Sequence, residues 1–192
     1  MDNTDGSIEA HSLTLTSGAL TNQHGRLVSL NDSAQYWRVS GILDNNSGEL
    51  GSNGDLQLDA GRLDNLGDTV KTQAGLTLYA SCNINNTQGK VLAGNALRLD
   101  ALGAFDNQQG QVNGAQLLLT AQRLNNAQGQ VVSQGDITLM ARRGLNNQGG
   151  LIGAGKALTI LTGDDGDNGA GSAQSETPLM ATARLGRAPA RR

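Results

Sequence analysis

The sequence predicts an all-β protein, a parallel β-solenoid with coils of about 21 residues and a disordered C-terminal tail. Three observations lead to this fold class: a repeated motif of constant phase, alternation of apolar and polar residues, and an unusual composition. Of 192 residues, 27 are Gly, 18 are Asn and only two are Pro. The 28 Leu residues can build a core, but aromatic residues make up only 2% of the chain.

The repeated motif consists of an apolar residue, any residue, and then Asn. Its Asn residues follow one another at intervals of 19 to 23 residues and are Asn22, Asn45, Asn65, Asn86, Asn107, Asn126 and Asn147. An aliphatic residue always stands five positions later: Leu27, Leu50, Val70, Val91, Val112, Val131 and Ile152. A fixed period of this length indicates a solenoid, because each repeat can bury its apolar face only against its neighbours.

Later in each repeat, two apolar residues flank a single other residue, as in Leu56/Leu58 and Leu158/Ile160. A period of two is typical of strands. Segments rich in Gly, Asn and Asp separate these pairs and supply the turns. We therefore expect two or three short strands per coil over residues 6–162, in about seven coils.

The Asn column is predicted to lie inside a turn. Stacked amide side chains can hydrogen-bond from one coil to the next, as they do in cross-β ladders. Such a ladder would satisfy buried polar groups that otherwise cost about 1–3 kcal/mol each. We expect these seven residues to have a structural role rather than to form a ligand-binding face.

One irregularity interrupts the first full repeat, where about four residues are inserted around Asn31 to Tyr36. Tyr36 and Trp37 stand there and are two of only a few aromatic residues in the chain. Loops on a rigid scaffold often bind ligands, so the pair is a candidate contact loop. Alternatively, Trp37 points inward, because it occupies the position of the repeat's buried leucine.

The pattern ends at Thr162. Residues 163–192 contain few strand formers, with an acidic start and a basic end that includes Arg191 and Arg192. Such a segment buries too little apolar surface to offset its ordering entropy, so we expect a low-complexity, disordered tail.

Several classes of protein are disfavoured by composition. A net charge of −3 argues against a nucleic-acid partner, which requires a basic face. No apolar run is long enough to span a membrane, and the first ten residues do not resemble a signal peptide. Cys82 is the single cysteine, so neither a disulfide framework nor a cysteine-based zinc site is expected. We expect no cofactor and no bound metal.

Parallel β-helices also host polysaccharide lyases and hydrolases, so a catalytic role is a further hypothesis. Catalysis there needs clustered carboxylates beside a basic residue. Asp44, Asp64 and Asp106 do share a column, directly before the Asn column. Asn replaces Asp in other coils, however, so the column is interpreted as turn chemistry and no catalytic residues are assigned.

The repeat resembles the haemagglutinin repeat of filamentous haemagglutinin-like proteins. The resemblance covers about residues 6–162 and rests on the in-phase motif copies, for example Arg62 to Gly67 followed by Ala74 to Ala80. It implies a right-handed parallel β-helix belonging to a large bacterial exoprotein of two-partner secretion, such as an adhesin, a virulence factor or a contact-dependent growth-inhibition stalk. The family's N-terminal secretion domain and C-terminal toxin domain have no counterpart here, so the chain is interpreted as an internal segment.

The resemblance implies a structural or adhesive shaft, secreted or carried on the bacterial cell surface. Implied partners are the outer-membrane transporter of the parent exoprotein and a protein or glycan on a host or neighbouring cell. A glycan-binding module using the Tyr36/Trp37 insertion is the alternative, and a polysaccharide-active enzyme is a third hypothesis. Since solenoid ends expose unpaired strand edges, end-to-end self-association is also expected.

Overall fold

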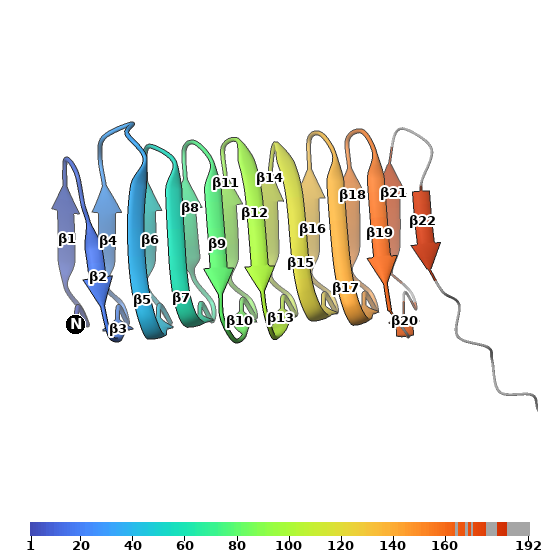
Figure 1. Cartoon of the computed structure of the whole chain (residues 1–192), viewed down its shortest axis with the longest axis horizontal. Helices are drawn as coiled ribbons and strands as arrows, with labels where there is room; N and C mark the ends of the chain where they lie inside the picture. Colours follow the sequence, from blue (N-terminus) through green and yellow to red (C-terminus); the bar gives the residue numbers. More distant parts are fainter. Residues whose placement is uncertain (164, 168, 170, 176–179, 184–192) are drawn as a thin grey trace, which may run out of the picture.

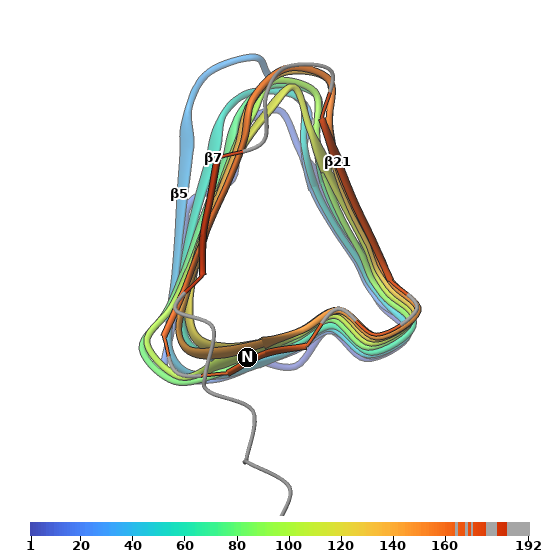
Figure 2. The same cartoon turned by 90° about the vertical axis from the view of Figure 1, so that its right-hand side faces the viewer.

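The computed structural model describes residues 1–163, 165–167, 169, 171–175 and 180–183. Its strands stack side by side along one axis (Figure 1), and each coil traces a three-sided outline when viewed along that axis (Figure 2). The strand pairings between neighbouring coils are parallel, from β1 with β4 to β19 with β22. The predicted all-β parallel solenoid with coils of about 21 residues is confirmed.

One side of the solenoid is a sheet of nine short strands. At about 4.8 Å per strand step, these strands span about 38 Å. The strands are β1 (Ser7–Ala10), β4 (Arg26–Ser29), β6 (Glu49–Ser52), β8 (Thr69–Thr72), β11 (Lys90–Ala93), β14 (Gln111–Gly114), β16 (Gln130–Ser133), β18 (Leu151–Ala154) and β21 (Ser172–Ser175).

The other two sides belong to a second sheet, in which long strands bend at a corner. The pairing register shifts between Val39 and Ile42 in β5 and between Ala121 and Arg123 in β15. In other coils the strand is interrupted at this corner, and two shorter strands follow the same course, as β9 and β10 do. The members are β2 (Leu15–Ser17), β3 (Leu20–Thr21), β5 (Gln35–Asp44), β7 (Leu56–Asp64), β9 (Leu76–Ala80), β10 (Ile84–Asn85), β12 (Ala96–Ala101), β13 (Ala104–Asp106), β15 (Gln116–Asn125), β17 (Ile137–Asn146), β19 (Leu158–Thr162), β20 (Asp165–Asp167) and β22 (Met180–Ala183).

The core consists of columns of like residues, one from each coil. Leu50 pairs with Leu27 and Val70, and Leu78 pairs with Leu58 and Leu99. Because side chains alternate between the two faces of a strand, a constant phase places the same apolar position inward in every coil. The aliphatic residues five positions after the motif Asn are all buried.

The strands continue beyond Thr162, the predicted end of the repeats. Residues 165–167 of β20 pair with β17, Ser172–Ser175 of β21 pair with β18, and β22 pairs with β19. The apolar signal is weak there, because Ala173 stands opposite Ile152 and Gly166 stands opposite Leu145. The other tail residues expected to be disordered, 164, 168, 170, 176–179 and 184–192, lie outside the described part of the chain.

Candidate functional site

The most regular polar feature is a column of buried Asn side chains at one corner of the solenoid. All seven predicted Asn residues lie in it with no exposed surface. Each Nδ2 donates to the Oδ1 of the next Asn, from Asn22 to Asn45 at 2.7 Å through to Asn126 to Asn147 at 2.7 Å. Asn3 adds a rung at the N-terminal end, because its Nδ2 donates to Asn22 Oδ1 at 2.7 Å.

Each Asn also closes its own turn and holds the following coil. Asn86 Nδ2 lies 3.2 Å from the main-chain oxygen of Gly89 and 3.2 Å from that of Gln111. Asn86 therefore donates to its own turn and to the next coil, and it accepts from Asn65. A side chain so fully hydrogen-bonded and buried offers nothing to a ligand, which favours the structural interpretation of the column.

The turn that surrounds each Asn has a fixed backbone form. Two positions after the Asn, the residue is left-handed, for example His24 (φ 52°) and Gln109 (φ 56°). The next residue is usually Gly, and it contacts the preceding coil closely. A Cβ on Gly110 would lie 2.2 Å from the main-chain oxygen of Asn86. The coil spacing therefore selects glycine at this position.

Asp68 is the exception in this glycine position. Its contact with the preceding coil is longer than in other coils: the Thr69 N–H donates to Gly48 O at 3.4 Å, whereas the equivalent bond from the Gln111 N–H to Gly89 O measures 2.8 Å. Desolvation raises the pKa of the Asp68 carboxyl, partly offset by a hydrogen bond from the Ser47 backbone. The Cβ and the carboxylate of Asp68 thus both oppose tight stacking.

Two of the three acids in the column that suggested an enzyme accept backbone N–H groups of their own turns. Asp44 Oδ1 accepts the N–H of Asn46 at 3.0 Å, and Asp106 Oδ1 accepts the N–H of Gln108 at 3.0 Å. In other coils an Asn oxygen makes the same bond, as Asn85 does. The third carboxylate of the column, Asp64, pairs with Arg62. Asp and Asn are interchangeable here because both supply the accepting oxygen.

The side chains of the two aromatic residues in the insertion point to opposite faces of β5. The coil containing β5 bulges outward relative to the others (Figure 2). Trp37 is fully buried, pairs with Leu15 and Leu58, and donates its indole N–H to the Leu13 carbonyl oxygen at 2.7 Å. Trp37 is therefore not available to contact a ligand. Its inward orientation, the alternative interpretation of the sequence, is the one the structure shows. The wider coil accommodates an indole where other coils hold leucine.

Tyr36, by contrast, lies on the outer face of β5 with 44% of its surface exposed. Its hydroxyl donates to Asp59 Oδ2 at 2.7 Å, and this hydrogen bond is the main cause that raises the pKa of Tyr36. Of the predicted contact loop, one aromatic side chain thus remains accessible, held by a carboxylate of the next coil.

Other reactive side chains are scattered. Among the described residues, no group of three or more His, Cys, Asp and Glu side chains could hold a metal ion. Cys82 is a free, exposed thiol. His24 Nδ1 lies 3.7 Å from Asp5 Oδ1, with both side chains largely exposed. The part of the chain that the structure describes contains no helix long and apolar enough to cross a membrane.

Parallel coils of constant phase around an Asn ladder define a β-solenoid repeat protein. The family model for the haemagglutinin repeat matches residues 2–35, 10–81, 83–139 and 124–183. The chain therefore belongs to the haemagglutinin repeat family, whose repeats are typically structural and non-catalytic. Neither a curated protein nor a solved structure matches it.

Proposed function

We propose that the chain is a shaft segment of a secreted, filamentous haemagglutinin-like exoprotein on the bacterial surface. The observation that carries this proposal is the continuity of the Asn ladder, which joins every coil from Asn3 to Asn147 by side-chain hydrogen bonds. Each inner coil pairs on both sides with its neighbours, so length can be added by repetition without a new core. A shaft needs this kind of stiffness along one axis.

Family membership supports the proposed location. Proteins of the filamentous haemagglutinin family are usually secreted or surface-bound. The proposal includes an outer-membrane transporter for the parent exoprotein and a protein or glycan of a host or neighbouring cell as its target. Antibodies raised against this chain should label intact producing cells, and the labelling should vanish when the transporter gene is deleted. Labelling only after cell lysis would contradict the surface location.

The shaft role is tested by removing one period. Deletion of residues 65–85 joins Asp64 directly to Asn86 and preserves the motif on both sides. We expect a folded protein that is shorter by about 4.8 Å in small-angle scattering and unfolds cooperatively.

The matched control is a deletion of residues 65–74, about half a period. It places every later Asn and leucine out of phase with the preceding coils, so the rod should lose its compact scattering profile. If the two deletions behave alike, the repeats do not act as interchangeable units of a shaft.

A further inference from the structure

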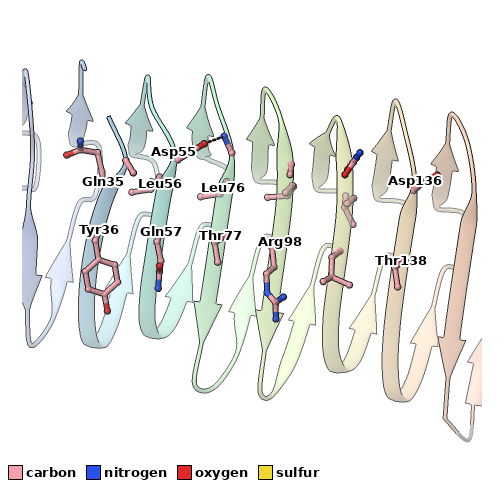
Figure 3. Close-up of a pocket in the computed structure, with 17 residues that line it drawn as sticks. Gln35, Tyr36, Asp55, Leu56, Gln57, Leu76, Thr77, Arg98, Asp136 and Thr138 are labelled. Carbon is pink, nitrogen blue, oxygen red and sulfur yellow. Dashed lines mark hydrogen bonds between the residues drawn. The ribbon is translucent and has the colours of Figure 1, made fainter. Parts of the chain in front are cut away.

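A shallow groove of about 800 Å³ runs along the outside of the second sheet, parallel to the solenoid axis. It crosses six successive strands, from β5 to β17, and therefore extends about 24 Å. Tyr36, Gln57, Thr77 and Arg98 project from successive strands in one row along it (Figure 3). Leu118 and Thr138 continue this row, and Gln116 lines the groove at the register position of Ala96.

Small residues form part of the groove lining at the corner before the strands. Ala34, Gly75 and Ala96 line the groove there. Asp55 and Asp136 border it, but both carboxylates accept backbone N–H groups, from Gly75 at 2.7 Å and from Ala157 at 3.0 Å. The acids thus fix the shape of the corner.

Several lining groups are available to a ligand. Within the described residues, the side chains of Thr77, Gln116 and Thr138 make no hydrogen bond. Arg98 keeps 54% of its side chain exposed while pairing with Asp100 at 2.6 Å. Tyr36 contributes a partly exposed aromatic ring at the end of the row.

The geometry argues against a peptide strand as the occupant. Addition of a strand requires an unpaired sheet edge, but the strands under the middle of the groove pair on both sides, as β7 does with β5 and β9. Side chains on one face of an extended peptide also repeat every ~6.6 Å, out of step with coils spaced at ~4.8 Å.

The charges argue against a polyanion. The groove is lined by two carboxylates and one guanidinium, and the guanidinium is already paired. Polyanion binding depends on unpaired cations that displace counterions. A neutral polymer that presents many hydroxyl groups and apolar ring faces fits better. The amide and hydroxyl side chains of the groove can hydrogen-bond its hydroxyl groups, and the Tyr36 ring can stack on its apolar ring faces.

We propose that this groove binds a neutral, linear oligosaccharide lying along the solenoid axis. Tyr36 stacks on one sugar ring, and Gln57, Thr77 and Arg98 hydrogen-bond hydroxyl groups of the rings that follow. The proposal rests on the surface-exposed shaft proposed above and adds the chemical class of a ligand and its position.

The test is binding of the whole chain to an array of neutral linear oligosaccharides of glucose, N-acetylglucosamine, mannose and galactose, from disaccharides to octasaccharides. Heparin oligosaccharides of matched length are the polyanion arm. We expect at least one neutral series to bind with an affinity that rises with length. Binding of no neutral series, or preferred binding of heparin, would overturn the proposal.

Site specificity is tested with two exposed tyrosines of the same sheet. Tyr36→Ala should weaken binding by about ten-fold, and Tyr36→Phe should retain it because the ring remains. Tyr79, also exposed but outside the groove lining, is the matched control, and Tyr79→Ala should leave affinity unchanged. Equal losses in both alanine variants would refute the assignment. Since scattering measures the rod independently, a flat array leaves the shaft proposal standing.

Discussion

At the scale of single residues, the side-chain amide of the motif Asn performs three tasks at once. Asn86 accepts from the preceding Asn, donates to the following one, and bonds the oxygen atoms of Gly89 and Gln111. Buried amides with all partners satisfied contribute modestly to stability, but leaving their partners unpaired is costly. The ladder is therefore sensitive to the loss of any inner member.

Asn86→Ala should lower the free energy of unfolding by about 3 kcal/mol, because it leaves an amide and carbonyl oxygens without partners in the interior. Urea denaturation monitored by circular dichroism measures the loss. Asn113→Ala is the control, since Asn113 is exposed on β14 and should change stability by less than about 0.5 kcal/mol. Similar values for both variants would show that the ladder is energetically neutral.

The glycine after the left-handed residue provides a second test. Gly110→Ala places a methyl group 2.2 Å from Asn86 O, so it should destabilise the protein by about 1–3 kcal/mol through overpacking. Asp68→Ala produces the same residue at the equivalent position of another coil, where the backbone already accommodates a Cβ. Its effect should be far smaller. If Asp68→Ala costs as much as Gly110→Ala in thermal unfolding, close coil contact is not the reason for glycine.

Asp68 should also make the stability of the protein depend on pH. Its pKa is raised by desolvation, so the folded state disfavours the carboxylate, and this cost appears as the pH rises through the carboxyl pKa. Asp68→Asn should therefore raise the melting temperature at neutral pH. The gain should fade as the pH drops below the ordinary aspartate value of 3.8. A gain that is independent of pH would contradict desolvation as the cause.

At the scale of elements, strand β5 shows how the solenoid tolerates an irregular coil. The coil widens, Trp37 fills the extra space, and the polar side chain of Gln35 replaces the leucine at the start of the strand. Gln35 is satisfied there, because Nε2 donates to Asn31 Oδ1 at 2.8 Å and Oε1 accepts the Leu13 N–H at 3.0 Å. The insertion is thus packed as a structural part of the coil.

Trp37→Ala should cost about 3–5 kcal/mol, because the widened coil cannot close around the cavity. Tyr36→Ala, at the next position but on the outer face, should cost less than about 1 kcal/mol. Chemical denaturation measures both. In addition, the fluorescence of the single Trp should be blue-shifted and poorly quenched by acrylamide. Ready quenching would show that the indole is exposed.

Most of the solenoid could be predicted from the sequence, because each coil places the same types of residue at the same positions, at a fixed interval along the chain. The phase of Leu50 and Val70 relative to their Asn residues directly gives their inward orientation. Asn3 was missed although Met1-Asp2-Asn3 has the apolar-x-Asn form. Its interval to Asn22 and the aliphatic Ile8 five positions later fit the repeat, so the periodicity could have found it. For Trp37 the insertion suggested a contact loop, whereas its place at the repeat's buried leucine position indicated the inward orientation that the structure shows.

The outer groove could not be predicted. It is lined by small corner residues such as Gly75 and Ala96 and by longer outward side chains of neighbouring coils. Outward positions carry no periodic constraint, so their sizes vary independently from one coil to the next. A groove of this kind becomes visible only when the register of strands β5 to β17 is known. The repeat pattern therefore predicts the core residues but not the shape of the outer surface.

At the scale of the whole molecule, the ends of the rod differ from its middle. Strand β1 pairs with β4, and no other described strand pairs with it. Ile8 and Leu13, near that end, are only partly buried against the core. Unpaired backbone groups beside partly covered apolar residues favour pairing with another strand.

The chain should therefore associate end to end as its concentration rises, adding strands in the direction in which the coils already stack. Sedimentation velocity should show a coefficient that increases with concentration. Scattering should show growing length with an unchanged cross-section, because lateral packing would widen the rod instead. A single species at all concentrations would contradict the prediction, as would growth in the cross-section. The direction of growth follows from the fold, since hydrogen-bonding groups of the backbone point along the axis while the three sides present side chains.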